Sequence, residues 1–358
     1  GFAFNGKELD AAQDPVNLRI AGAIYAGQTH SPSIQMGECI KVMTGAMMPP
    51  NCDTVIPQEF TKSSEEGSIT FAKDTVRAGD NRRLCGEDLQ AGKPAIQRGR
   101  ILKASDIGLA ASLGIAKLEV YQRIKVAILS SGDELCSIGI PLQPGKIYDS
   151  NRFSLHACLS KLGFEIIDCG IVRDTPDDLR QAFMQAAQKA DVIISSGGVS
   201  VGEADFTKQI MEELGQVGFW KIAMRPGRPM AFGSLKPVSP KTAPTVFFGL
   251  PGNPVAVMVT FYQFVRNALL HLNGALNPEI PLVSIQSAEA IRKKSGRTEF
   301  QRGILFRDPE GRLLVKSTGS QGAGILRSMS EADCFMILHH DQGNIAPGDW
   351  VDVEIFDG

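Results

Sequence analysis

The feature that most constrains the fold is a strand–loop–helix alternation that is repeated over residues 123–273. Residues 124–129 form a nearly continuous apolar run, as a parallel strand covered on both faces requires. Leu155, Leu159 and Leu162 then recur at helical spacing. The alternation predicts an open, mainly parallel α/β sheet with helices on both faces. Further strands are expected at 165–172, 191–195 and 245–249, and further helices are expected to begin at Thr175, to end near Leu214 and to span 254–272.

The segments on either side of this α/β region are rich in short strands. Before it, strands are expected at 37–43, 53–57 and 68–71, with one helix at 105–113 that begins at a Ser105 N-cap. After it, strands expected at 282–285, 313–316, 334–338 and 350–355 predict a small β-barrel or β-sandwich. The predicted fold class is therefore multidomain α/β plus β.

The charge balance and the apolar pattern limit the partners of the chain. Lys and Arg number 37 against 39 Asp and Glu, so we expect no nucleic-acid partner, which would need a strongly basic face. The most apolar stretch, 246–265, is interrupted by glycines and prolines, so we expect no membrane span. The seven cysteines are scattered without a CxxC pair, which favours a reducing cytoplasm. Because the start at Gly1 has neither Met nor a signal-peptide pattern, we expect a fragment or a processed or trimmed chain.

The loop from Ser195 to Gly202 is the strongest local signal for a ligand. Ligands on an open parallel sheet bind beyond the carboxyl ends of the strands, where this loop is expected. Gly197 and Gly198 allow a tight turn and a close approach of the backbone to a ligand. Ser196, Ser200 and the amides before the next helix are suited to phosphate oxygens. An ordinary turn between strand and helix is the competing interpretation, since the loop matches neither a P-loop nor a dinucleotide fingerprint.

Carboxylates follow the same strand ends. Glu134, Asp174 and Asp205 are expected to converge there, and Mg²⁺ in proteins commonly takes one or two carboxylates together with phosphate oxygens and water. The competing interpretation is that such residues cap helices, which fits Asp178 best.

Basic residues are concentrated in the segment 221–229. Lys221, Arg225 and Arg228 flank a Pro-Gly turn that exposes Arg228, and Arg is well suited to forked binding of an oxyanion. A basic surface turn is the competing interpretation. Arg297 and Arg302 are expected to supplement this charge from the last domain.

Nucleophilic catalysis is disfavoured, because the chain has no GxSxG motif and its five histidines have no evident Ser or Cys partner. His156 is expected within a helix, where a structural role is favoured, and the adjacent His339 and His340 are expected to point to opposite faces of a strand. The pattern as a whole indicates metal-assisted transfer involving an anion.

Several longer segments resemble the molybdopterin molybdenumtransferase family, which includes the E domain of gephyrin. Together these segments span essentially the whole chain, and several long motifs in order are more specific than any single loop. The resemblance is carried by residues 43–46, 79–83, 86–89, 131–135, 195–207, 219–229, 248–255 and 318–322.

The resemblance implies a homodimer of elongated subunits, each built from four domains. The implied domains are a truncated β-rich domain at 1–92, part of a linking domain at 93–123, a molybdopterin-binding α/β domain at 124–274 and a C-terminal β domain at 275–358. The implied activity is insertion of molybdate into adenylylated molybdopterin, with Mg²⁺-dependent release of AMP. A molybdopterin adenylyltransferase and a non-enzymatic dimeric scaffold are the alternatives. Implied partners are the second subunit, the molybdopterin adenylyltransferase and other cofactor-synthesis proteins.

The resemblance also implies roles for individual residues. Glu134, Asp174 and Asp205 would serve the metal and the pterin nucleotide, with Thr44 and Asp88 contributed across a subunit boundary. Three departures from the family pattern are a start within a motif at Gly1, arginines where lysines are common, and Ala323 where a serine is common, with Ser320 as a nearby substitute. The implied substrate-binding residues are Ser196, Gly197, Gly198, Ser200, Gly202, Lys221, Arg225, Arg228, Pro251, Gly252, Asn253 and Arg297.

Overall fold

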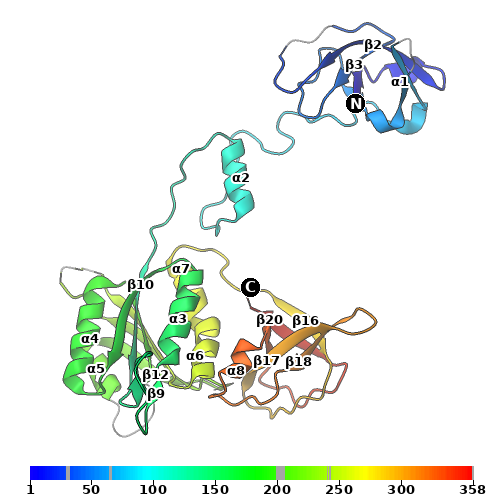
Figure 1. Ribbon diagram of the computed structural model, residues 1–358. Coiled ribbons are helices and arrows are strands. Elements are labelled where there is room, and N and C mark those ends of the chain that lie inside the picture. The colour runs from blue at the N-terminus through cyan, green and yellow to red at the C-terminus, as the bar shows by residue number, and fades with distance from the viewer. Residues whose placement is uncertain (30–32, 64–66, 199–205, 240, 242, 357–358) are drawn as a thin grey trace. The chain divides into compact units, whose positions relative to one another are not determined.

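The computed structural model divides into two compact units, Gly1–Ala95 and Ile96–Gly358 (Figure 1). The residues that the structure describes are 1–29, 33–63, 67–198, 206–239, 241 and 243–356.

The first unit is built on a six-stranded sheet with the strand order β4-β1-β3-β2-β6-β5. Phe2, Phe4, Leu18, Ile69 and Phe71 fill its core from alternating positions of their strands, since successive residues of a strand face opposite sides. The predicted strands are confirmed as β3, β4 and β6, whereas β1, β2 and α1 were not predicted. The elements are β1 (Phe2–Phe4), α1 (Glu8–Ala11), β2 (Val16–Ile24), β3 (Glu38–Val42), β4 (Thr54–Ile56), η1 (Gln58–Phe60), β5 (Lys62–Ser63), β6 (Ser68–Phe71) and η2 (Lys73–Thr75).

A six-stranded sheet with the order β10-β7-β11-β15-β14-β12 lies at the centre of the second unit. The strands from β10 to β15 pair in parallel, and β14 and β12 continue the sheet in antiparallel fashion. The mainly parallel sheet is thus confirmed, with an antiparallel edge that was not predicted. The strands are β7 (Lys125–Ser131), β10 (Glu165–Val172), β11 (Val192–Ser196), β12 (Gly215–Lys221), β14 (Pro229–Leu235) and β15 (Thr245–Leu250), and β8 (Leu135–Cys136) and β9 (Ile147–Tyr148) form a small ribbon.

Helices cover both faces of this sheet, as predicted (Figure 1). Along β7, Val126 and Ile128 pack with α3 and α6, while Ala127 and Leu129 pack with α4 and α5. Both sets of side chains are buried, which explains why the strand is apolar throughout. The helices are α3 (Ser150–Lys161), α4 (Pro176–Lys189), α5 (Phe206–Leu214), α6 (Pro254–Thr260) and α7 (Arg266–Leu272), with the π-helical turn η3 (Phe261–Val265) between the last two.

The predicted helix starts are confirmed in one case and wrong in another. Thr175 is the N-cap of helix α4, and its hydroxyl accepts a hydrogen bond from the Asp178 amide at 3.3 Å. The same hydroxyl donates to the Asp178 carboxylate at 2.9 Å. Helix α2 (Ala104–Ser112) does not begin at Ser105. The Asp106 carboxylate accepts from the Lys103 amide at 2.9 Å, so a later residue reaches back to satisfy the free amide.

The helical run Pro254–Leu272 is long and apolar, although we expected no membrane span in this sequence. Its 19 residues, with a mean hydropathy of 1.3, meet the length and composition of a membrane span. However, 56% of this run is buried inside the protein, where Val257, Phe261 and Leu269 belong to the core beside the central sheet. Core helices of globular proteins have the same properties.

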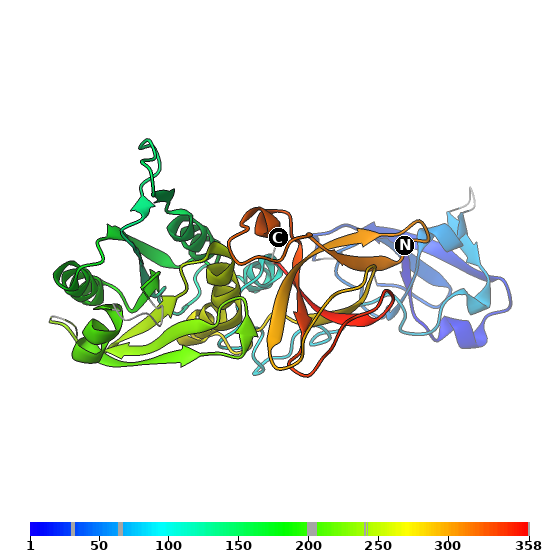
Figure 2. The same cartoon turned by 90° about the horizontal axis from the view of Figure 1, so that it is seen from below.

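The C-terminal region is a small closed β-barrel rather than a sandwich. Strands β17, β18, β16, β20 and β19 pair in sequence, and the pairing of β17 with β19 closes the ring. The barrel packs on helix α6 through Phe300 and Phe335, which meet Val255 and Val259, and Figure 2 shows its orange and red strands beside the yellow helical run. The elements are β13 (Met224–Arg225), which pairs with β17, and β16 (Leu282–Ser287), β17 (Thr298–Arg307), β18 (Leu313–Ser317), α8 (Arg327–Ser330), β19 (Cys334–Leu338) and β20 (Trp350–Ile355). Along the chain, a β-rich sheet is followed by the α/β sheet and then by the C-terminal β-barrel, as the sequence predicts. The limits of the four domains stay a prediction.

Candidate active site

A cavity of about 1030 Å³ lies where the carboxyl ends of the parallel strands face the C-terminal barrel. The strand ends contribute the loops after β7, β10, β11 and β15, and the barrel side contributes Arg297, Gln321 and Ala323. Its position is the one at which open α/β sheets bind ligands. The predicted residues that line it are Glu134, Asp174, Gly197, Gly198, Arg225, Arg228, Pro251, Gly252, Asn253 and Arg297.

The glycines after β11 are required by the protein itself. Gly197 and Gly198 have φ angles of +88° and +67°, in the left-handed region that other residues rarely adopt. A Cβ at Gly197 would lie 2.4 Å from the Ser131 carbonyl oxygen, and one at Gly198 would lie 2.5 Å from the Thr207 hydroxyl. By contrast, a Cβ at Gly252 would meet no atom within 4 Å.

Asn151 joins two of the cavity loops, and the sequence analysis did not identify this role. Its amide nitrogen donates to the Ser196 hydroxyl at 2.8 Å and to the Gly252 carbonyl at 2.7 Å. Ser196 is buried at the end of β11, directly before Gly197. It is not among the described residues that line the cavity. Asn151 therefore fixes the spacing between the loop after β11 and the loop after β15.

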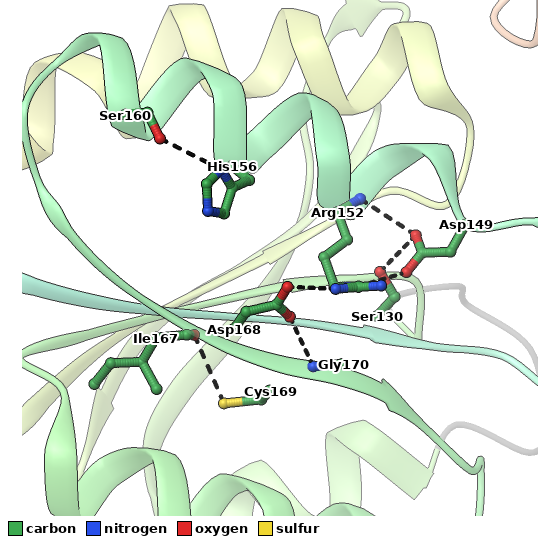
Figure 3. Close-up of polar contacts among 9 residues, drawn as sticks. All are labelled: Ser130, Asp149, Arg152, His156, Ser160, Ile167, Asp168, Cys169 and Gly170. Carbon is green, nitrogen blue, oxygen red and sulfur yellow. Dashed lines mark hydrogen bonds and ion pairs between the residues drawn. The ribbon is translucent and has the colours of Figure 1, made fainter. Parts of the chain in front are cut away.

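A partly buried ion-pair network holds the start of α3 against the end of β7 (Figure 3). Asp149 accepts hydrogen bonds from the Ser130 hydroxyl at 3.0 Å and from Nε of Arg152 at 2.9 Å. Arg152 lies between Asp149 and Asp168 on β10 and pairs with both. Since Asn151 lies within this turn, the network also orients its amide group. His156, further along α3, contacts only Ser160 among the residues drawn in Figure 3.

Carboxylates form one charged group in the cavity lining. Burial, and then the negative charges of Asp133 and Glu134, raise the pKa of Asp174. Glu134 folds back over Gly132, where an added Cβ would lie 2.7 Å from a carboxylate oxygen. Across the described parts of the chain, no group of three His, Cys, Asp or Glu side chains has the placement of a metal cluster.

Arginines form a second charged group in the cavity lining. Arg225 and Arg228 flank Pro226 and Gly227, which are buried while both arginines are exposed, as predicted for Arg228. A Cβ at Gly227 would lie 2.7 Å from the Thr260 methyl group, so this turn packs closely on α6. Arg297 lines the cavity from the barrel side.

Other predicted residues lie elsewhere. Lys221 ends β12 with an exposed side chain, outside the cavity lining formed by described residues. Arg302 is fully buried in β17 and hydrogen-bonded to Ser328 and Gly322, outside the described lining of this cavity, and the expectation that it supplements the charge of the segment 221–229 stays a prediction. The substrate-contact predictions for Ser200, Gly202 and Asp205 fall outside the described residues, and Thr44 and Asp88 belong to the separate unit Gly1–Ala95.

Family profiles match the chain along most of its length. The profile described as the MoeA N-terminal region (domain I and II) matches residues 1–114. The profile described as a probable molybdopterin binding domain matches residues 127–271. The profile described as the MoeA C-terminal region (domain IV) matches residues 284–356.

Individual relatives agree with these profiles. The molybdopterin molybdenumtransferase of Haemophilus influenzae is 40% identical over 99% of this chain and 86% of its own length. The molybdopterin molybdenumtransferase of a Nostoc species is 35% identical over 94% of this chain and 76% of its own length. Gephyrin of Dictyostelium discoideum is 30% identical over 87% of this chain and 47% of its own length.

Solved structures show the same fold. A molybdopterin biosynthesis MoeA protein from Pyrococcus horikoshii matches 99% of this chain and 86% of its own with a TM-score of 0.78 and 26% identity. A second structure of a MoeA protein from this source matches 100% of this chain and 86% of its own, with a TM-score of 0.69 and 29% identity. The chain thus belongs to the molybdopterin molybdenumtransferase family.

Proposed function

We propose that the protein inserts molybdate into adenylylated molybdopterin and releases AMP, as a step of molybdenum cofactor biosynthesis. Family membership supports a transfer of molybdenum to molybdopterin, since the relatives are named molybdopterin molybdenumtransferase. The observation that carries the proposal for this chain is one cavity whose lining includes both carboxylates, Glu134 and Asp174, and a group of arginines, Arg225, Arg228 and Arg297. A volume of about 1030 Å³ suits a large ligand such as a pterin joined to a nucleotide.

The carboxylates of the lining fit a hard divalent cation such as Mg²⁺. Carboxylate oxygens are the ligands that this cation prefers, and the raised pKa of Asp174 reflects burial and uncompensated negative charge beside it. Glu134 and Asp174 would hold the cation, and Asp205 is proposed as a third ligand. When bound, the cation would supply positive charge that stabilises the phosphate oxygens of the departing AMP.

The remaining residues would bind and orient the substrates. The tight backbone at Gly197 and Gly198 and the open face of Gly252 allow the pyrophosphate to approach the main chain closely. Arg225, Arg228 and Arg297 would hold the molybdate dianion, because guanidinium groups donate paired hydrogen bonds to oxyanions. Asn253 and Pro251 would shape the cavity wall, and Lys221 would attract anions towards the cavity.

The active form is proposed to be a homodimer with a cross-subunit site. Several large apolar side chains are exposed between Ile101 and Tyr121, including Val120 at 68%, and burial of exposed apolar side chains favours association. Thr44 and Asp88 would complete each site from the partner subunit. The molybdopterin adenylyltransferase and other cofactor-synthesis proteins are further proposed partners, since the adenylyltransferase would supply the adenylylated molybdopterin.

A cytoplasmic location is also proposed. All seven cysteines are free, and burial raises the pKa of Cys39 and of Cys334 to about 12, so these two thiols are protonated and unreactive at neutral pH.

The test is AMP release by the purified full-length protein. We expect AMP and active cofactor to form from adenylylated molybdopterin only when molybdate and Mg²⁺ are both present. No AMP release under these conditions would refute the proposal. Consumption of ATP with molybdopterin as co-substrate would instead assign the preceding adenylylation step.

A further inference from the structure

Lys293 is a buried lysine of the C-terminal region, with only 5% of its surface exposed. Lysine is rarely buried, because removal of an ammonium group from water is costly unless its three donors find acceptors. Here Nζ donates to three main-chain carbonyls, those of Lys294 at 3.2 Å, Gln342 at 3.2 Å and His340 at 3.5 Å. An apolar residue would fill the space without this cost, so the three contacts indicate what the ammonium contributes.

These contacts join residues 293–296 to the loop 339–344. The main-chain amide of the same lysine donates to Oδ1 of Asn344 at 2.9 Å. At the other end of the short segment, the Gly296 amide donates to the His340 carbonyl at 2.9 Å. This carbonyl is one of the three that accept from Nζ, so the ammonium holds the same group that receives the Gly296 amide.

Arg297, which lines the cavity from the barrel side, directly follows this segment. The residue before it, Gly296, has a φ angle of +99°, in the left-handed region that favours glycine. The residue after it, Thr298, donates from its amide to the Ala223 carbonyl at 3.0 Å, where β13 pairs with β17. The main chain of Arg297 is therefore fixed on both sides, by the loop that accepts from Gly296 and by the segment that ends in β13.

We propose that Lys293 is a positioning residue that fixes the direction in which Arg297 enters the cavity. Lys293 does not itself touch a substrate, since it is buried and is not among the described residues that line the cavity. A compact ammonium with three donors suits three carbonyls around one point better than the planar fork of an arginine does. As far as it concerns molybdate, this inference rests on the proposed function.

The test is a double-mutant cycle between Lys293 and Arg297, with AMP release measured against molybdate concentration. Lys293→Met keeps an unbranched apolar stem and removes the ammonium. We expect it to raise the KM for molybdate by about threefold to fivefold, less than Arg297→Met does, and to leave the rate at saturating molybdate nearly unchanged. In a chain that already carries Arg297→Met, the second change should raise this KM no further, because its effect passes through the arginine.

Asn344→Ala is a milder change at the same contact, because Asn344 is exposed and only its bond to the Lys293 amide is lost. It should raise the KM for molybdate by a smaller factor, again without effect in a chain that carries Arg297→Met. This variant carries the same cycle if Lys293→Met does not fold.

Two controls separate this role from charge and from stability. Lys294→Met removes the ammonium of the exposed neighbour, and Val353→Ala truncates a buried residue of the barrel core. Neither should raise the KM for molybdate by a comparable factor. Hydrogen exchange of the amides in 294–298 should become faster in Lys293→Met and stay unchanged in Lys294→Met.

Additive effects of Lys293→Met and Arg297→Met on the KM for molybdate would show that Lys293 has only a structural role, and the inference would fail. An equal increase in Val353→Ala at a similar loss of thermal stability would lead to the same conclusion, and so would an unchanged KM in Lys293→Met. If the wild-type protein released no AMP, the proposed function would fail. Exchange at 294–298 in Lys293→Met against Lys294→Met would then still decide whether Lys293 holds the segment around Arg297.

Discussion

At the scale of single residues, the cavity combines groups whose placement is unfavourable for the protein alone. Asp174 is half-buried beside two other carboxylates, and Gly197 and Gly198 adopt backbone angles that other residues avoid. Such features concentrate at functional sites, because the surrounding fold supports them. The glycines were recognisable in the sequence as a motif, whereas Asn151 was not. Its two partners, Ser196 and Gly252, are 45 and 101 residues away, so no local pattern announces the contact.

Asp174→Asn is expected to stabilise the metal-free protein at neutral pH. Because the folded-state pKa of Asp174 is raised, the folded protein binds this proton more tightly than the unfolded chain, and stability falls as pH rises through the window above the ordinary carboxyl pKa of about 4. Asparagine cannot ionise and escapes this loss. Thermal unfolding between pH 4 and pH 8 should show the two proteins converging at the acid end.

The same variant should lose most of the stabilisation that added Mg²⁺ confers on the wild type. Asp341→Asn, in which the replaced side chain is fully exposed, is the control and should change neither property. A midpoint for Asp174→Asn that lies below that of the wild type without metal would contradict this account of the cavity carboxylates.

Alanine at Gly197 and at Gly252 should have opposite consequences. At Gly197 the new methyl group would collide with the Ser131 carbonyl in a left-handed backbone, so we expect a loss of stability of more than about 1 kcal/mol. At Gly252 the methyl group meets open space in the cavity, so the fold should persist while the KM for adenylylated molybdopterin rises. Unfolding curves and substrate titrations of both variants decide this, and normal substrate binding by Gly252→Ala would exclude the close approach.

At the scale of elements, the strands of the parallel sheet were predictable because both of their faces are buried. The strands that were missed lack this signal for physical reasons. In β17, Glu299, Gln301 and Arg302 are buried polar residues, which hide the expected alternation. In β12 and β14, Gly215 and Gly233 stand where a Cβ would lie 2.1 Å from the backbone of the partner strand, and glycine is normally depleted in strands. Thus the strands that carry the cavity loops could be predicted from the sequence, whereas β17, β12 and β14 could not.

The link between α3 and the cavity loops can be tested through Asn151→Ala. Two hydrogen bonds would be lost, one of them to a buried hydroxyl, so we expect a destabilisation of about 1–3 kcal/mol. The KM for adenylylated molybdopterin should rise as well, because the two loops are no longer held at a fixed spacing. Ser160→Ala on the same helix serves as the control and should be close to neutral. Equal kinetics for the two variants would show that Asn151 does not position the loops.

At the scale of the whole molecule, the proposed cross-subunit site can be tested by mixing two inactive variants. Glu134→Gln would inactivate the site by a change in the unit Ile96–Gly358, and Asp88→Asn would inactivate it by a change in the unit Gly1–Ala95. If each site takes one residue from each subunit, a mixed dimer has one intact site and one with both lesions. Random re-association of equal amounts should then restore about a quarter of the wild-type AMP release. Activity that stays at the level of the separate variants would place both residues in sites of a single chain.

The central claim is that one cavity divides the two tasks between its carboxylates and its arginines, and AMP release as a function of molybdate concentration tests it most directly. Glu134→Gln should lower the rate at saturating molybdate by about 100-fold or more and leave the KM for molybdate nearly unchanged. Arg297→Met should raise that KM by about tenfold, while Arg327→Met, which removes a guanidinium with 85% exposure, should do neither. An unchanged rate for Glu134→Gln, or the same parameter altered by both cavity variants, would contradict this division between the carboxylates and the arginines.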